Sequence, residues 1–138
     1  MPAGYSGTPL VQKLGIKPGH RLLLVQAPPD FAMTLGELPA DLVLASPAMK
    51  QLDVILLFAK SFADLRKRFG PLAGRLIGNG SLWVCWPKKA AKLPTDLDEN
   101  VVRDHGLGVG LVDVKVCAVD ETWSGLKFVI RLADRKKV

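Results

Sequence analysis

Two short stretches of the sequence combine tryptophan with charged side chains. Residues 86–89 read WPKK and residues 120–124 read DETWS, while residues 27–31, APPDF, add an aspartate and a phenylalanine. Lysines attract anions, tryptophan faces stack on planar groups or contact cations, and an aspartate can act as a general acid or base. Brought together in space, these side chains would bind an anionic or aromatic small molecule.

Each of these stretches follows an apolar run that is typical of a buried strand. The runs lie at 21–27, 52–59, 81–86 and 111–119. Their nearly continuous apolar character is that of strands covered on both faces. A last strand is predicted at 126–132, and residues 120–125 join it to 111–119 as an antiparallel hairpin.

A weaker run at 41–46 is predicted as an edge strand or an irregular segment. Residues 47–51, which follow it, are too few for the helical crossover that joins parallel strands. Short helices are predicted at 7–15, with Thr8 as the N-cap and Gly15 at the end, and at 31–38.

A longer helix is predicted over residues 61–80. Ser61 and Asp64 approximate a capping box, and apolar residues recur behind them at steps of three and four. Gly70-Pro71 is expected to kink or split this helix, and Gly78 to Gly80 to end it.

A second longer helix is predicted at 95–106. Thr95 is expected to cap it and Gly106 to end it. The acids of its first turn, Asp96, Asp98 and Glu99, complement the positive end of the helix dipole, so we interpret them as structural and not as a metal site.

Strands that alternate with helices predict a mostly parallel sheet covered by helices on both faces. We therefore predict a single Rossmann-like α/β domain over residues 1–138, a three-layer sandwich that ends in the antiparallel hairpin. Residues 133–138 are expected to form a frayed basic tail. No apolar run approaches the roughly 18 residues of a membrane span.

The composition favours a cytoplasmic protein. Cys85 and Cys117 both lie within strand patterns and are expected to be free, buried thiols, as in a reducing compartment. The formal net charge is +6, but the basic residues are dispersed along the chain. Such a distribution favours a solvated surface over a nucleic-acid interface, although weak, salt-sensitive binding stays open.

The predicted fold indicates where a ligand must bind. In open α/β sheets, ligands occupy the crevice beyond the carboxyl ends of the strands. The strands deliver a set of candidate crevice residues to this edge: Pro28, Pro29, Asp30, Phe31, Lys60, Ser61, Trp86, Lys88, Lys89, Asp120, Trp123 and Ser124. The structural alternative is that Trp86 packs under a helix and that the lysines after it belong to an ordinary exposed loop.

The same reasoning leaves the catalytic residues and cofactors unassigned. His20 and His105 are expected at the opposite edge of the sheet, with His105 complementing the carboxyl end of its helix. The sequence has no serine nucleophile elbow, no cysteine–histidine metal spacing and no Walker-type loop. We predict neither metal nor cofactor, and in an enzyme Asp30, Asp120 or a lysine would have to act as acid or base.

A charged stripe is predicted near the carboxyl end of the chain. Asp113 and Lys115 are two residues apart and are expected on one face of their strand, with Lys127 opposite. This pattern is typical of a cross-strand ion pair or of an edge defended against aggregation. A protein-binding or homo-oligomeric surface stays open.

Three motifs resemble a group of small bacterial proteins catalogued as a domain of unknown function. They are YSGTPLVQKLGIKPG near the start, LWVCWPKK in the middle and GLVDVKVCAVDETWSGLKFVIR near the end. This resemblance implies no active site. A weaker resemblance, from DVILLFA through LAGRLIGNGSLWVCWPK and in the closing hairpin, is to S-adenosylmethionine-dependent methyltransferases. Those enzymes carry a glycine-rich motif after the first strand, where this chain has QAPPDF.

Three functions follow from these observations. The missing glycine loop favours a non-catalytic binding or regulatory domain, because proline offers no N–H and hinders close approach of the backbone. The first alternative is an enzyme that acts on an anionic or aromatic small molecule at the carboxyl edge of the sheet. The second is a weak nucleic-acid-associated protein.

Overall fold

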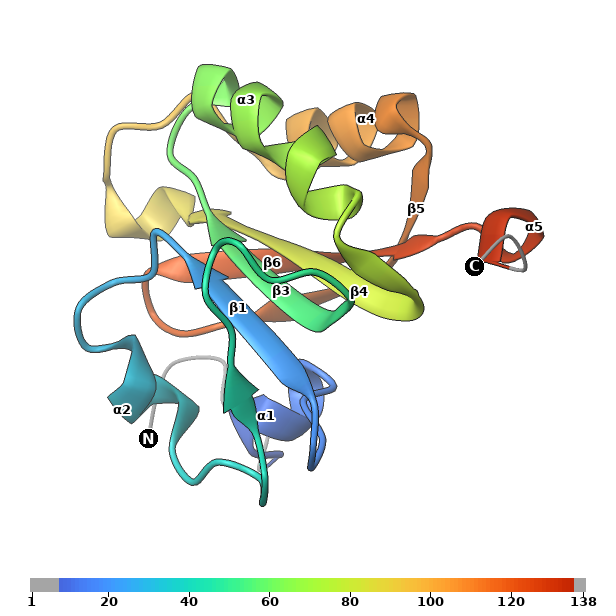
Figure 1. Cartoon of the computed structure of the whole chain (residues 1–138). Coiled ribbons are helices and arrows are strands. Elements are labelled where there is room, and N and C mark those ends of the chain that lie inside the picture. Colours follow the sequence, from blue (N-terminus) through green and yellow to red (C-terminus); the bar gives the residue numbers. More distant parts are fainter. Residues whose placement is uncertain (1–7, 136–138) are drawn as a thin grey trace.

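A computed structural model describes residues 8–135 of the chain. One six-stranded sheet, in the order β2-β1-β3-β4-β6-β5, forms its centre (Figure 1). The strands are β1 (Arg21–Val25), β2 (Val43–Leu44), β3 (Leu52–Phe58), β4 (Leu76–Pro87), β5 (Leu111–Ala118) and β6 (Trp123–Ile130). The helices are α1 (Leu10–Lys13), α2 (Phe31–Leu35), α3 (Phe62–Ala73), a 3₁₀ turn (Lys89–Ala91), α4 (Glu99–Val109) and α5 (Leu132–Arg135).

The sheet is mostly parallel, as predicted. β1 pairs in parallel with both β2 and β3, and β3 pairs in parallel with β4. β6 is antiparallel to β4 and to β5, so β5 runs in the direction of the parallel strands. The strand near residues 41–46 is a two-residue edge strand. The carboxyl ends of β1, β3, β4 and β5 therefore meet at one edge.

Two apolar layers cover the sheet. On one face, α3 and α4 contribute Leu65, Phe69 and Val102 to a core with the sheet; on the other, α1 and α2 contribute residues that include Leu14 and Phe31 (Figure 1). The predicted three-layer α/β fold with a closing antiparallel hairpin is confirmed.

α3 ends earlier than the sequence pattern predicts. The helix runs through Pro71 and stops at Ala73, so Pro71 removes a backbone hydrogen bond only near its last turn. Gly78 and Gly80 belong to β4. At Gly80, a Cβ would lie 2.9 Å from the carbonyl oxygen of Leu52, where the register of β3 and β4 shifts. These glycines serve a close passage of two strands and not a helix end.

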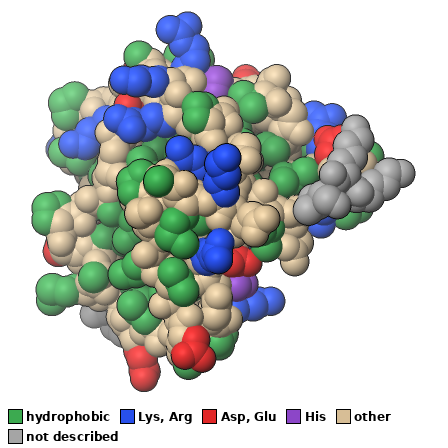
Figure 2. Space-filling model, viewed as in Figure 1, with side chains coloured by type: hydrophobic (Ala, Val, Ile, Leu, Met, Phe, Trp, Pro, Cys, Tyr) green, Lys and Arg blue, Asp and Glu red, His purple; other side chains and the backbone are tan. Residues whose placement is uncertain are grey.

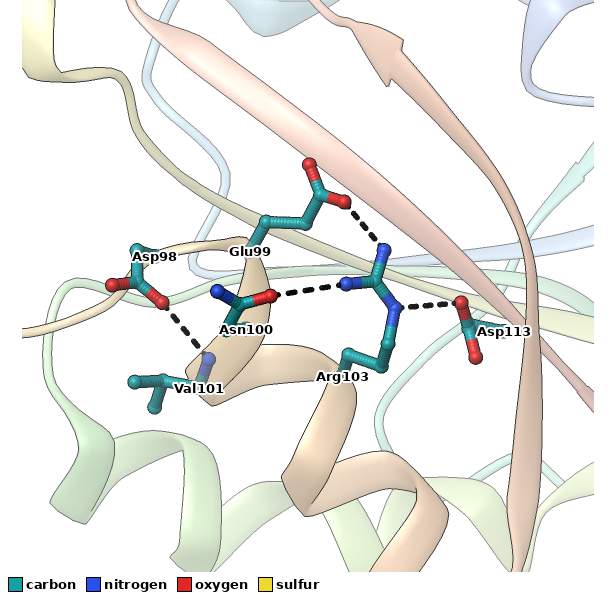
Figure 3. Close-up of polar contacts among 6 residues, drawn as sticks. All are labelled: Asp98, Glu99, Asn100, Val101, Arg103 and Asp113. Carbon is teal, nitrogen blue, oxygen red and sulfur yellow. Dashed lines mark hydrogen bonds and ion pairs between the residues drawn. The ribbon is translucent and has the colours of Figure 1, made fainter.

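The ends predicted for α4 are also wrong. Asp98, not Thr95, is the N-cap, and its carboxylate accepts a hydrogen bond from the Val101 N–H at 2.9 Å (Figure 3). Gly106 lies inside the helix, where a Cβ would come within 2.1 Å of the Phe128 ring. The helix ends at Gly110, whose φ of +116° favours glycine.

The predicted caps of α1 do not form as expected either. Pro9 occupies the N-cap position and no side chain caps the helix, so Thr8 has no such role. Gly15 does adopt a left-handed φ of +76° after the helix. Residues 1–7, which include the first part of the YSGTPL motif, and residues 136–138 of the basic tail lie outside the described residues; residues 133–135 belong to α5.

The charged stripe on β5 is divided by a bulge. The register of β5 against β6 shifts between Asp113 and Lys115, so the two side chains point to opposite faces. Asp113 accepts a hydrogen bond from Arg103 Nε of α4 at 2.8 Å (Figure 3), whereas Lys115 Nζ lies 3.5 Å from the carbonyl oxygen of Lys13 in α1. Lys115 is the register neighbour of Lys127, so the predicted cross-strand ion pair is wrong.

Candidate functional site

A cavity of about 670 Å³ lies at the carboxyl ends of β1 and β3, beside the turn that joins β5 and β6. We call it the edge cavity. Its size falls within the range of small-molecule sites. Its lining residues are Gln26, Ala27, Pro28, Pro29, Phe58, Lys60, Ser61, Asp64, Leu93, Thr122 and Trp123.

One wall of the edge cavity is aromatic. The rings of Phe58 and Trp123 meet edge to face with centroids 5.1 Å apart, and Phe31 meets Phe58 in the same way at 4.9 Å. Phe31 is 1% exposed and does not line the cavity. It supports Phe58 from behind, so the wall is a packed aromatic stack against which a planar ligand can lie.

A polar bridge crosses between β1 and α3. Gln26 has a φ of +60°, and its side-chain amide donates to the Phe58 carbonyl oxygen at 2.8 Å and to the Asp64 carboxylate at 2.5 Å. The other carboxylate oxygen of Asp64 accepts a hydrogen bond from Arg68 Nε at 2.8 Å. The Gln26–Asp64–Arg68 bridge therefore fixes one end of the cavity.

Asp64 is held as an anion. Partial burial by itself raises the pKa of its carboxyl, but the hydrogen bonds from Arg68 and Gln26 outweigh burial and lower the pKa below its ordinary value. The backbone N–H of Asp64 also donates to Ser61 Oγ at 3.2 Å, which caps α3 as predicted. Because both carboxylate oxygens have donors, Asp64 is a structural anion and a poor general base.

The loop that carries Lys60 is tied down from its far side. Thr95 Oγ1 donates to the Lys60 carbonyl oxygen at 2.6 Å, and Asp96 accepts from the Phe62 N–H at 2.7 Å. The Lys60 side chain itself is exposed and forms no ion pair within residues 8–135. Its ammonium group is thus free for an anion on a backbone that is fixed.

The structure separates the twelve predicted crevice residues. Pro28, Pro29, Lys60, Ser61 and Trp123 line the edge cavity. A second hollow of about 560 Å³, which we call the α4 depression, is lined by Trp86, Lys88, Lys89 and Ser124 together with the acidic start of α4. Trp86 is 6% exposed and packs in the core shared with α3 and α4, as the structural alternative holds.

The remaining candidates line neither hollow. Asp30 is exposed at the start of α2, and Phe31 is buried behind the aromatic wall. Asp120 organises the hairpin turn, since its carboxylate accepts from the N–H groups of Thr122 at 2.8 Å and Trp123 at 2.9 Å. Its acid is therefore bound to its own turn and is not directed at a ligand.

Four lining residues, Gln26, Asp64, Leu93 and Thr122, were not among the predicted candidates. The one sequence signal for Gln26 is a polar residue that ends an apolar run, and Asp64 has a sufficient explanation as part of a cap. Only the tertiary structure shows that the two side chains meet, because they are 38 residues apart.

His105 does not lie where the sequence predicts. It is inside α4, with its ring edge to face against Phe62 and Phe69 at centroid distances of 5.5 and 5.4 Å. Its Nε2 is buried without a hydrogen-bond partner, and burial together with nearby Arg66 lowers the pKa. A neutral imidazole between two helices cannot complement the end of the helix by charge.

His20 remains beside the amino end of β1, with Nε2 3.9 Å from Asp53. Cys85 and Cys117 are free thiols; Cys85 is buried and Cys117 half-buried. Within residues 8–135, no group of three or more His, Cys, Asp or Glu side chains could hold a metal ion. No helix in that part of the chain is long and apolar enough to span a membrane.

Similar folds occur among S-adenosylmethionine-dependent methyltransferases. The fold matches such an enzyme from Aquifex aeolicus with a TM-score of 0.58, at 17% identity and over 88% of each chain. A TehB-like methyltransferase from Corynebacterium glutamicum matches at 0.55, with 10% identity over 94% of this chain and 91% of that one. No protein-family model and no curated protein sequence matches this chain.

A further structural match contains ligands. A Burkholderia thailandensis 1,6-didemethyltoxoflavin-N1-methyltransferase, solved with 1,6-didemethyltoxoflavin and S-adenosylhomocysteine, gives a TM-score of 0.54 at 12% identity, over 86% of this chain and 73% of that one. These neighbours are enzymes, so they overturn the expectation of a non-catalytic binding or regulatory domain and favour the enzyme alternative. The fold-level resemblance is confirmed, whereas the motif-level resemblance stays a prediction.

The turn after β1 allows a test of whether the cofactor of these neighbours fits. Pro28 and Pro29 have no N–H, and the Phe31 N–H already donates to the Pro28 carbonyl oxygen at 3.0 Å. Asp30 adds a carboxylate at the start of α2, which is only five residues long. A cofactor that bears a carboxylate would meet few donors and a like charge here. The chain thus has the fold of S-adenosylmethionine-dependent methyltransferases, with a turn after β1 that does not fit their cofactor.

Proposed function

We propose that the protein is an enzyme that acts on an anionic or aromatic small molecule bound in the edge cavity. The observation that carries this proposal is the composition of the cavity, in which Lys60 lies free near a packed wall formed by Phe58 and Trp123. The cavity occupies the edge at which open α/β sheets bind their ligands. The enzymatic nature of the structural neighbours supports catalysis over binding alone.

The lining residues divide into those that hold the wall and those that are free for a ligand. Gln26 and Asp64 are engaged with each other. The Lys60 ammonium group can bind an anion, and the Ser61 and Thr122 hydroxyls can donate to a polar ligand atom. Since no histidine or cysteine lines the cavity, the contribution of the protein is to bind, orient and desolvate its substrate and not to form a covalent bond with it.

A matched pair of leucines provides the test. Leu93 lines the edge cavity and Leu107 lies on α4 outside it, and both are 37% exposed. Leu93→Glu adds a carboxylate to the cavity and should repel an anionic substrate, whereas Leu107→Glu adds the same charge elsewhere. The measurement is depletion of metabolites from a deproteinised cell extract, followed by mass spectrometry.

Wild type and Leu107→Glu should deplete the same anionic or aromatic metabolites, and Leu93→Glu should not. An extract left unchanged by wild type, or depleted equally by Leu93→Glu, would contradict the proposal. S-adenosylmethionine added to the extract should leave the depletion unchanged, because the turn after β1 does not fit it.

A further inference from the structure

A second cavity opens on the outer side of the Gln26–Asp64–Arg68 bridge. It measures about 440 Å³ and lies between residues 23–25 of β1 and α3; we call it the β1 groove. It exists because β2 pairs only with Arg21 and Leu22, which leaves residues 23–25 without a strand on that side. Its apolar floor continues onto Leu72 and Pro71 of α3.

The rim of the β1 groove is cationic. Lys67, Arg68 and Arg75 line it, and no acidic residue does. Lys67 and Arg75 form no ion pair within residues 8–135, and Arg68 uses only its Nε toward Asp64. Lys and Arg side chains gather over the region of α3 at the top of the view in Figure 2, above a surface with many apolar side chains. Unpaired cations beside an apolar floor complement a molecule that has an acidic group and an apolar body.

The β1 groove and the edge cavity share a partition. Gln26 lines both, while Asp64 lines the edge cavity and Arg68 the groove. The 2.8 Å ion pair of Asp64 and Arg68 joins the two lining sets through one side-chain bridge. A ligand that reaches past Gln26 would therefore place different parts of itself in the two cavities.

We propose that the β1 groove binds the acidic group of an amphipathic organic anion, a phosphate or carboxylate attached to an apolar body. Lys67, Arg68 and Arg75 bind the acid, and the body lies over residues 23–25 toward the edge cavity. The inference rests on the proposed function in one respect, because the molecule that spans both cavities is taken to be the substrate. The phosphate is compact enough to contact the free terminal N–H groups of Arg68 without displacing Asp64 from its Nε.

Three probes separate the contributions of the two cavities. They are 1-naphthyl phosphate, its uncharged parent 1-naphthol, and inorganic phosphate, each titrated by calorimetry into the full-length protein. The groove variant is Lys67→Gln/Arg75→Gln, and Arg66→Gln is the control, since Arg66 lies on the same helix and is absent from the groove lining. Leu93→Glu reports on the edge cavity.

The groove variant should weaken binding of 1-naphthyl phosphate by about tenfold or more, and Arg66→Gln by less than about twofold. Binding of 1-naphthol should not change in the groove variant. Equal affinity of wild type and the groove variant for 1-naphthyl phosphate would overturn the inference, as would an effect of the same size in Arg66→Gln.

The outcomes also separate this inference from the proposed function. If Leu93→Glu weakens both naphthyl probes while the groove variant changes neither, the edge cavity binds its ligand and the groove inference is wrong. If the groove variant alone weakens 1-naphthyl phosphate and Leu93→Glu has no effect, the groove binds anions independently and the proposed function is wrong. Backbone amide shifts at residues 23–26 and 67–75 should accompany binding to the groove.

Discussion

The edge cavity and the α4 depression lie at the same edge of the sheet, but they use their charges differently. In the α4 depression, Lys88 and Lys89 share the lining with Asp96, Asp98 and Glu99. All three acids have structural partners: Asp96 accepts from the start of α3, Asp98 caps α4 and Glu99 pairs with Arg103 (Figure 3). The lysines there face carboxylates that cannot leave.

In the edge cavity the single acid is neutralised from behind and the lysine is free. Arg68 pairs with Asp64 from the side of the β1 groove, and Lys60 has no acidic partner within the described residues. An anion is therefore repelled less here than in the α4 depression. The comparison teaches that a count of lysines near a strand end does not locate an anion site, because the partners of the nearby acids decide the local charge.

The largest effect that would sharpen this comparison concerns the two tryptophans. Trp123→Leu and Trp86→Leu each remove a buried indole, and each should lower the free energy of unfolding by about 2–5 kcal/mol. Only Trp123→Leu should also abolish binding of 1-naphthol, because Trp123 lines the edge cavity and Trp86 does not. Urea denaturation and calorimetry measure the two effects. Loss of probe binding in Trp86→Leu but not in Trp123→Leu would reverse the assignment of the cavities.

A smaller effect concerns the position of α4 over the sheet. Gly106→Ala places a methyl group against the Phe128 ring, within 2.1 Å without movement, and should cost about 1–3 kcal/mol of stability. Gly108→Ala is the matched control: nothing lies within 4 Å of its Cβ position, and the change should stabilise the helix by about 0.5–1 kcal/mol. Thermal unfolding measures both variants. Equal melting temperatures would show that the contact of α4 with β6 is not as close as described.

The architecture could be predicted from the sequence because it depends on local pattern. Apolar runs marked the strands, the short connection after 41–46 marked an edge strand, and the turn at 120–125 marked the hairpin. The helix ends could not be predicted, because Gly80 and Gly106 are required by contacts with Leu52 and Phe128, which are remote in sequence. A glycine that admits a neighbour looks the same in a sequence as one that ends a helix.

The site was predicted only as far as the rule for strand ends reaches. That rule placed Lys60, Ser61 and Trp123 correctly at the edge, but it could not show that Trp86 and Trp123 belong to different faces. The pairing of Pro87 with Trp123 and of Trp86 with Ser124 decides this point, since successive residues of a strand alternate between faces. The contact between Gln26 and Asp64 depends on the left-handed backbone at Gln26, which no local pattern marks.

A third prediction concerns the bridge that neutralises the edge cavity. Asp64→Asn removes the charge that pairs with Arg68 and should lower stability by about 1–3 kcal/mol at neutral pH. Because the pKa of Asp64 in the folded protein lies below its ordinary value, its contribution is complete above that value, near pH 4, and declines as the pH falls through the lowered pKa. The difference in stability between wild type and Asp64→Asn should thus shrink below about pH 4.

The same variant releases Arg68, so it should tighten binding of 1-naphthyl phosphate in the β1 groove. Asp98→Asn is the control in the α4 depression, where the N-cap amide still accepts from the Val101 N–H. It should leave the affinity for the probe unchanged. Weaker binding in Asp64→Asn would mean that the bridge must stay intact for the ligand to bind.

The smallest effect concerns His105, which packs between α3 and α4 and so links the helices above both cavities. Burial lowers its pKa below the ordinary value of 6.5, so the unfolded chain takes up a proton first as the pH falls. The stability that neutral His105 contributes is therefore complete above pH 6.5 and is lost progressively below it, down to the lowered pKa. His105→Gln removes this titration, and its stability should change less between pH 7 and 5 than that of wild type, as measured by urea denaturation at each pH. Parallel pH profiles for the two proteins would contradict the neutral, buried imidazole, and with it the view that α3 and α4 meet through a contact that excludes charge while the β1 groove on the outer side of α3 collects it.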